Sequence, residues 1–124
     1  IMKKSTLFCD IDGTLLIYRE FSTYKNNQSV PIKETIDNIN VAFDKGHHII
    51  LTTARPEYLR YHTMEELSDA DIQFHTLIMG IARGPRLLIN DNEKDSINRA
   101  FAINVKRNHT FTKEQSKLFN TIIS

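Results

Sequence analysis

The chain has 124 residues, a length that suits one compact domain spanning residues 1–124. Hydrophobic residues make up 40% and charged residues 25%, an ordinary globular composition that excludes disorder over most of the chain. The formal net charge of +1 offers no electrostatic basis for binding nucleic acid or an anionic membrane, and no apolar run approaches the roughly 20 residues of a membrane helix. Because no export signal is visible either, we expect a cytoplasmic protein that binds neither nucleic acid nor membrane.

The first half of the chain alternates predicted strands and helices. Residues 6–9 form a short apolar run that predicts a buried strand, and residues 17–30 lack a clear period and predict a loop. Pro31 then begins a helical pattern that Gly46 follows, and residues 48–52 predict a second strand. Pro56 begins another helix, with four apolar or aromatic residues expected near one side: Tyr58, Tyr61, Met64 and Leu67.

The second half continues the alternation. Residues 74–79 predict a third strand, residues 86–89 a fourth and residues 101–105 a fifth. Thr112 and Gln115 match a capping box at the start of a C-terminal helix. Strands that alternate with helices indicate an α/β fold with a mostly parallel sheet, covered by helices on both faces.

Acidic side chains follow two of these predicted strands. Asp10 and Asp12 come directly after the first strand, and Asp91 follows the fourth. In an open parallel sheet, ligands bind at the carboxyl ends of the strands, so these acids are expected at one edge. Neighbouring carboxylates repel each other, and a bound cation or a shared proton would offset that repulsion. The third acid, Asp91, favours a cation, and oxygen ligands suit a hard ion such as Mg²⁺. Cys9 is the single cysteine and is expected to be a small core residue rather than a nucleophile.

Residues 8–15, Phe-Cys-Asp-Ile-Asp-Gly-Thr-Leu, resemble the first motif of the haloacid dehalogenase-like phosphatases. The resemblance implies a three-layer α/β/α Rossmann-like core and a phosphoric monoester hydrolase that uses Mg²⁺ as its cofactor. It further implies that Asp10 is the nucleophile, which forms an aspartyl-phosphate, and that Asp12 is the general acid and base.

Three further motifs extend the resemblance over residues 6–107. Residues 49–55 resemble the second motif, which implies that Thr53, or else Thr52, holds the phosphoryl group and places Arg55 near it. Residues 86–91 resemble the fourth motif, which implies that Asp91 binds the metal together with Asp10 and the backbone carbonyl of Asp12. The third motif normally supplies a lysine, and no lysine lies between Lys45 and Lys94. The cations in the corresponding place are Arg86, which we favour, and Arg83.

The short segments between the predicted strands leave no room for a separate cap domain, so a capless member with an open site is expected. Four side chains of the first loop are candidates for substrate contact: Tyr18, Arg19, Tyr24 and Lys25. Residues 84–91 and 102–105 resemble a narrower group of small phosphatases found with surface-polysaccharide and sugar-nucleotide biosynthesis, which implies a phosphorylated sugar or related small metabolite as substrate. A homo-oligomer is compatible with the open site. The alternatives are a catalytically inactive interaction module and a receiver-type phosphoacceptor domain.

Overall fold

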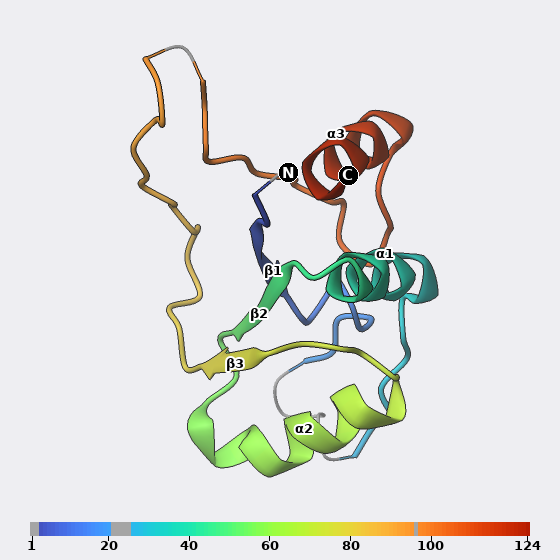
Figure 1. The fold of residues 1–124 in the computed structure, drawn as a ribbon. Helices are drawn as coiled ribbons and strands as arrows, with labels where there is room; N and C mark the ends of the chain where they lie inside the picture. The colour runs from blue at the N-terminus through green and yellow to red at the C-terminus, as the bar shows by residue number, and fades with distance from the viewer. Residues whose placement is uncertain (1–2, 21–25, 96) are drawn as a thin grey trace.

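The computed structural model describes residues 3–20, 26–95 and 97–124 of the chain. Its centre is a parallel sheet of three strands, β1 (Thr6–Asp10), β2 (His48–Thr53) and β3 (Thr76–Met79), in the order β1-β2-β3 (Figure 1). Asp10 pairs in register with Thr52, and Thr53 pairs with Met79. The carboxyl ends of all three strands therefore lie along one edge of the sheet, as the α/β reading predicts.

In the described parts of the chain, these helical segments accompany the sheet: α1 (Lys33–Asp44), the short 3-10 helix η2 (Glu57–Leu59), α2 (Arg60–Asp69) and α3 (Lys113–Ile123). Helix α1 ends before Gly46, whose φ of 91° is a conformation that glycine adopts without strain. Helix α3 begins with the predicted capping box: the Thr112 hydroxyl accepts from the Gln115 N–H at 3.2 Å, and the Gln115 side chain accepts from the Thr112 N–H at 2.9 Å. Within the described residues, no helix is long and apolar enough to cross a membrane.

Helices η2 and α2 together turn a different side toward the core than the sequence pattern predicts. Tyr58, Tyr61 and Met64 are exposed, whereas Leu59, Thr63 and Leu67 are buried. The buried residues are spaced four apart and so share one face of the helical segment. Tyr58, Tyr61 and Met64 are spaced three apart, as the residues of one helix face can be. The buried face instead includes Thr63, a polar residue that a hydrophobic pattern does not place in a core.

One face of the sheet carries the core. Ile49, Leu51 and Leu77 are buried in the main hydrophobic cluster, whereas Phe8 and Ile78 on the other face are 55% and 41% exposed. In the part of the chain that the structure describes, the sheet is thus covered on one face only, although the α/β pattern predicts helices on both.

The fourth and fifth predicted strands are not formed. Residues 86–89 and 101–105 form no regular secondary structure and lie outside the sheet, and all residues in 82–95 and 97–99 are exposed. We call residues 81–95 and 97–102 the arm; in Figure 1 it is the long yellow-to-orange excursion away from the helices. The chain rejoins the body near Asn108, whose N–H donates to the Gly13 carbonyl at 2.8 Å. A strand needs a neighbour to satisfy its backbone groups, and the arm has none in the sheet of this chain.

Candidate active site

The site begins in the tight turn that follows β1. The Leu15 N–H donates to the Ile11 carbonyl at 2.8 Å, and the Gly13 N–H donates to the Leu16 carbonyl at 2.7 Å. Gly13 has φ of 86°, and a Cβ atom there would lie 3.2 Å from Cγ of Arg107. Position 13 therefore favours glycine for both its backbone conformation and its lack of a side chain. This turn brings Asp10 and Asp12 to the carboxyl edge of the sheet.

Asp10 is the last residue of β1, and its carboxylate is partly exposed. One oxygen, Oδ2, accepts from the Thr14 hydroxyl at 3.2 Å, and the other, Oδ1, lies 3.5 Å from Nη2 of Arg86. Desolvation raises the pKa of Asp10 and the negative charge of Asp12 raises it further, while the Thr14 hydrogen bond and the Arg86 charge act in the opposite direction. Asp10 thus presents an accessible carboxylate in surroundings that weakly disfavour its charge.

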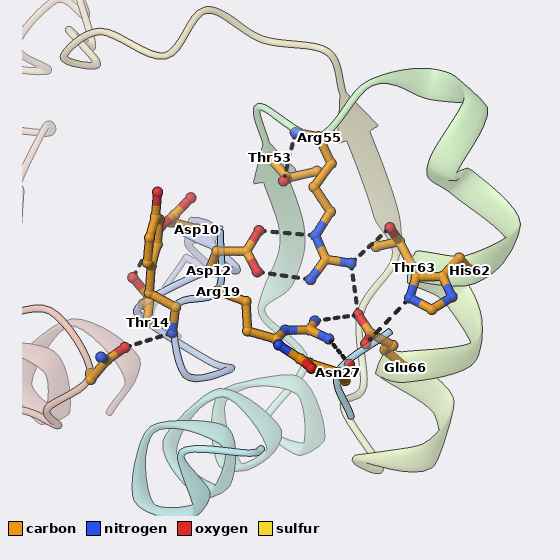
Figure 2. A network of polar contacts seen from close by, with 12 residues as sticks. Asp10, Asp12, Thr14, Arg19, Asn27, Thr53, Arg55, His62, Thr63 and Glu66 are labelled. Carbon is orange, nitrogen blue, oxygen red and sulfur yellow. Dashed lines mark hydrogen bonds and ion pairs between the residues drawn. The ribbon is translucent and has the colours of Figure 1, made fainter. Parts of the chain in front are cut away.

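Asp12 is held by Arg55 in a two-pronged ion pair. The Arg55 Nη2 donates to Oδ1 at 2.8 Å and Nε donates to Oδ2 at 2.9 Å (Figure 2). Arg55 is only 1% exposed. The prediction that Arg55 reaches the phosphate is therefore not met: a buried guanidinium with both Asp12 oxygens bound orients that carboxylate instead.

The ion pair continues into the molecule through two residues that the motifs do not include. Arg55 also donates from Nη1 to Oε1 of Glu66 at 2.7 Å, and the same oxygen accepts from Nη2 of Arg19 at 2.8 Å. Arg19, a candidate for substrate contact, is thus buried beside Glu66. Figure 2 shows this charge relay, Asp12–Arg55–Glu66–Arg19, running from the turn after β1 to α2. The sequence gives no signal for these contacts. The burial of Glu66 would be such a signal, but burial cannot be deduced from one sequence in a helix rich in polar residues.

Opposing effects set the ionisation of the charge relay. Desolvation works against the charge of Arg55, but hydrogen bonds with and attraction to Asp12 and Glu66 outweigh it, so the pKa of Arg55 lies above its ordinary value. Desolvation likewise raises the pKa of Glu66, but the hydrogen bonds and charges of Arg19 and Arg55 prevail and lower it. Every charge in the relay has an opposite neighbour, which is the condition for keeping charges inside a protein.

Two threonines close β2 beside these acids. Thr52 is the register partner of Asp10 and shares its face of the sheet. Thr53 is buried, and its hydroxyl oxygen accepts from the Arg55 N–H at 3.1 Å. The Thr53 hydroxyl still has its own proton to donate, but it is only 1% exposed and lies on the face of the sheet opposite to Asp10.

The remaining predicted ligands come from the arm. Arg86 is exposed and reaches Asp10, as described above, whereas Arg83 lies exposed three residues earlier. Asp91 is exposed and pairs with Arg99 at 3.3 Å. Among the described residues no three acidic, histidine or cysteine side chains gather as a metal site, so this chain does not bring Asp91 to Asp10 and Asp12.

Two neighbouring residues have structural roles. Burial, and then the charge of Asp10, raise the pKa of Cys9 to about 12, so its thiol is not a reactive nucleophile at neutral pH. Tyr18 lies under the guanidinium of Arg107, 4.0 Å from the ring centre. Tyr24 and Lys25, the other loop candidates, lie outside the described residues.

Similar folds occur in solved structures. Two chains from structures of the Pnkp1/Rnl/Hen1 RNA repair complex superpose with a TM-score of 0.56 at 23% identity; they match 68% and 67% of this chain, which spans only 30% and 27% of theirs. A structural-genomics target protein from Vibrio cholerae superposes with a TM-score of 0.51 at 18% identity, covering 94% of this chain and 98% of its own. At these identities the likeness shows the fold.

No curated protein gave a significant match to the sequence. A family model described as haloacid dehalogenase-like hydrolase matches residues 7–117, which is most of the chain and includes both acids of the β1 turn, the end of β2 and the arm. The chain belongs to the haloacid dehalogenase-like hydrolase family.

Proposed function

We propose that the protein is a phosphomonoester hydrolase that works through an aspartyl-phosphate on Asp10. The observation that carries this proposal is the pairing of two unlike carboxylates in one turn. Asp10 is partly exposed and has an oxygen 3.5 Å from the exposed cation Arg86, whereas both oxygens of Asp12 are held by the buried Arg55. Two carboxylates with different surroundings suit two different chemical roles.

In the first step an Asp10 oxygen forms a bond to phosphorus, the bond from phosphorus to the ester oxygen breaks, and that oxygen takes a proton from Asp12. For this, Asp12 enters the step with a proton on an oxygen that has left the Arg55 guanidinium, while the other oxygen keeps the side chain in place; the proton taken from water in the second step restores this state. Arg86 offsets the negative charge that Asp10 and the phosphoryl oxygens bring together, and a threonine hydroxyl at the end of β2 donates to the phosphoryl group.

In the second step water gives a proton to Asp12 and bonds to phosphorus, while the bond from phosphorus to Asp10 breaks and releases inorganic phosphate. The contact with Arg55 orients the Asp12 carboxylate that accepts this proton. Splitting the displacement in two is worthwhile because uncatalysed hydrolysis of phosphate monoesters is exceptionally slow, needing up to about 10²¹-fold acceleration.

We infer Mg²⁺ as the cofactor from the oxygen donors at this edge of the sheet. When bound, it would supply positive charge to the phosphoryl oxygens. The described residues of one chain do not complete the ligand set of the ion. Asp10 is accessible, but Asp91 lies on the arm and pairs with Arg99. The mechanism above accordingly assigns no step to the ion.

The test is release of phosphate from an aryl phosphate, with and without Mg²⁺. We expect turnover that depends on the ion, and we expect Asp10→Asn to lower kcat by at least about 10³-fold without unfolding the protein. The matched control is Asp37→Asn, an exposed aspartate of α1 that pairs with Lys33; it should leave turnover unchanged.

Full activity in Asp10→Asn would overturn the aspartyl-phosphate mechanism. A chain that keeps its phosphate for long periods after treatment with acetyl phosphate would be a receiver-type phosphoacceptor, and one that neither hydrolyses nor retains phosphate would be an inactive interaction module. A panel of phosphorylated sugars and related small metabolites tests the substrate class that the sequence resemblance implies.

A further inference from the structure

The sheet is incomplete on the side of β1. Within the described residues β1 pairs only with β2, so it is an edge strand with a row of backbone groups that have no partner strand. The face that carries Phe8 and Ile78 is open as well. An unprotected edge and an open apolar face beside a catalytic carboxylate indicate that something pairs there.

The arm carries a segment suited to such an edge. Residues 87–89 are Leu, Leu and Ile, and Leu87 and Ile89 are 83% and 84% exposed. Consecutive apolar residues are typical of a strand that is buried on both faces of a parallel sheet. In a single chain these side chains are left in water, which costs roughly 1.5 kcal/mol or more for each.

The arm of one chain is too short to reach β1 of that chain in parallel orientation. Only six residues, 80–85, separate Met79 at the end of β3 from residue 86. Parallel strands need a crossover of about a dozen residues or more. A strand beyond β1 would lie three strand spacings, about 14 Å, from β3. To run parallel to β1 it would also have to start at the amino end of the sheet, about 13 Å away along the strands. The direct path that combines these two displacements is about 19 Å. The seven Cα–Cα steps from Met79 to residue 86 reach about 24 Å when fully extended, only about 5 Å more than the direct path. That margin is smaller than the roughly 10 Å at which a chain segment packs on the face of a sheet, so the connector does not pass over β2 and β1.

Two ion pairs show how the arm runs instead. Arg86 lies at the carboxyl end of β1, 3.5 Å from Asp10, and Glu93 pairs at 3.0 Å with Lys3, which precedes the amino end of β1. The arm is therefore antiparallel to β1 of its own chain. In a twofold dimer whose β1 strands face each other in opposite directions, the same arm runs parallel to β1 of the second copy.

We propose that two copies of this chain exchange arms: residues 86–89 of each copy pair with the β1 edge of the other. This pairing places Asp91 at the carboxyl end of the second copy's β1, next to Asp10 of the partner subunit, while Arg86 stays beside Asp10 of its own chain. Each site is then built from two chains, and the metal ligand missing from one chain is supplied by the other. The ligand role of Asp91 rests on the proposed phosphatase function; the exchange itself does not.

The first experiment measures oligomeric state by sedimentation velocity. The wild-type chain should be a dimer. Insertion of about 12 Gly and Ser residues between Gly84 and Pro85 should convert it to a monomer, because a connector of crossover length lets the arm close on its own β1. The same insertion between Asn26 and Asn27, in the first loop, is the control and should leave a dimer. A monomeric wild type, or a dimer that the longer connector does not dissociate, would overturn the exchange.

The second experiment asks whether Asp91 acts across the dimer. Asp10→Asn and Asp91→Asn should each be inactive alone. After the two variants are mixed and allowed to exchange subunits, mixed dimers hold one site with both acids intact, so about a quarter of wild-type activity should return. With the lengthened connector in both variants, no activity should return on mixing.

The outcomes separate the two proposals. An active wild type whose variants fail to complement each other would show that Asp91 does not act in trans. A wild type that is inactive on every phosphate ester but dimeric, and monomeric with the longer connector, would refute the proposed function while leaving the arm exchange established.

Discussion

Asp10 holds a charge in a place that disfavours it. Burial raises the pKa of Asp10 above that of an aspartate in an unfolded chain, so at neutral pH the carboxylate reduces the stability of the folded state. The folded state takes up its proton before the unfolded state does as the pH falls. The penalty is therefore present above the raised pKa, shrinks as the pH passes down through it, and is gone below the unfolded value.

This sign gives a prediction for the metal-free protein. In the presence of a chelator at pH 7, Asp10→Asn should raise the free energy of unfolding, by less than about 1 kcal/mol because solvent screens a partly exposed group. The gain should narrow as the pH falls toward 4. Urea denaturation of both proteins over this range measures it, and a difference independent of pH would contradict the prediction.

Glu66 is a residue of the opposite kind, since its charge is required. Glu66→Ala leaves two buried arginines, Arg19 and Arg55, without their shared partner, so the free energy of unfolding should fall by about 3–5 kcal/mol. Its exposed neighbour on α2 provides the control: Glu65→Ala should change stability by less than about 0.5 kcal/mol. Equal effects in the two variants would mean that the charge relay contributes nothing to the fold.

At the scale of elements, the sequence predicts features that depend on neighbouring residues, but it does not predict which side chains are buried. The β1 strand, the end of β2 and the capping box before α3 all depend on neighbouring residues, and the structure contains each of them. The inner side of α2 differs from the predicted one because Thr63 and Glu66 face inward and accept hydrogen bonds from Arg55. Arg55 lies outside the helix, so the helical period of the sequence does not reveal these contacts. The same contacts withdraw Arg55 from the phosphate-binding role that its motif implies.

The cap of α3 gives a prediction at this scale. Thr112→Ala removes the hydroxyl that accepts from the Gln115 N–H, so it should lower the free energy of unfolding by about 1 kcal/mol. Thr121→Ala, in the last turns of the same helix, is the matched control and should have a smaller effect because alanine favours helix. Thermal denaturation of both variants measures the difference; a larger loss from Thr121→Ala would show that the cap does not hold the helix.

Over the whole molecule, the sequence predicts the parallel α/β core but not the number of strands in its sheet: five strands are predicted, and three are formed in the described residues. Residues 86–89 have the composition of a buried strand, yet strand formation depends on a partner edge, and the six residues before them do not allow one within the chain. The acids at positions 10 and 12 were found because a single turn holds both. Asp91 is predicted beside them only if residues 86–89 join the sheet; in this structure they lie outside it, and Asp91 pairs with Arg99.

The two arginines that face these acids will answer added salt differently. Arg55 meets Asp12 inside the protein, where dissolved ions do not enter, whereas Arg86 meets Asp10 at the surface across 3.5 Å. The screening length shrinks from about 8 Å at physiological ionic strength to about 3 Å in molar salt. Concentrated electrolyte should thus weaken the attraction between Arg86 and Asp10 while the ion pair of Arg55 with Asp12 persists. Under the proposed function, the affinity for a phosphate ester should therefore fall at salt concentrations that leave the fold intact.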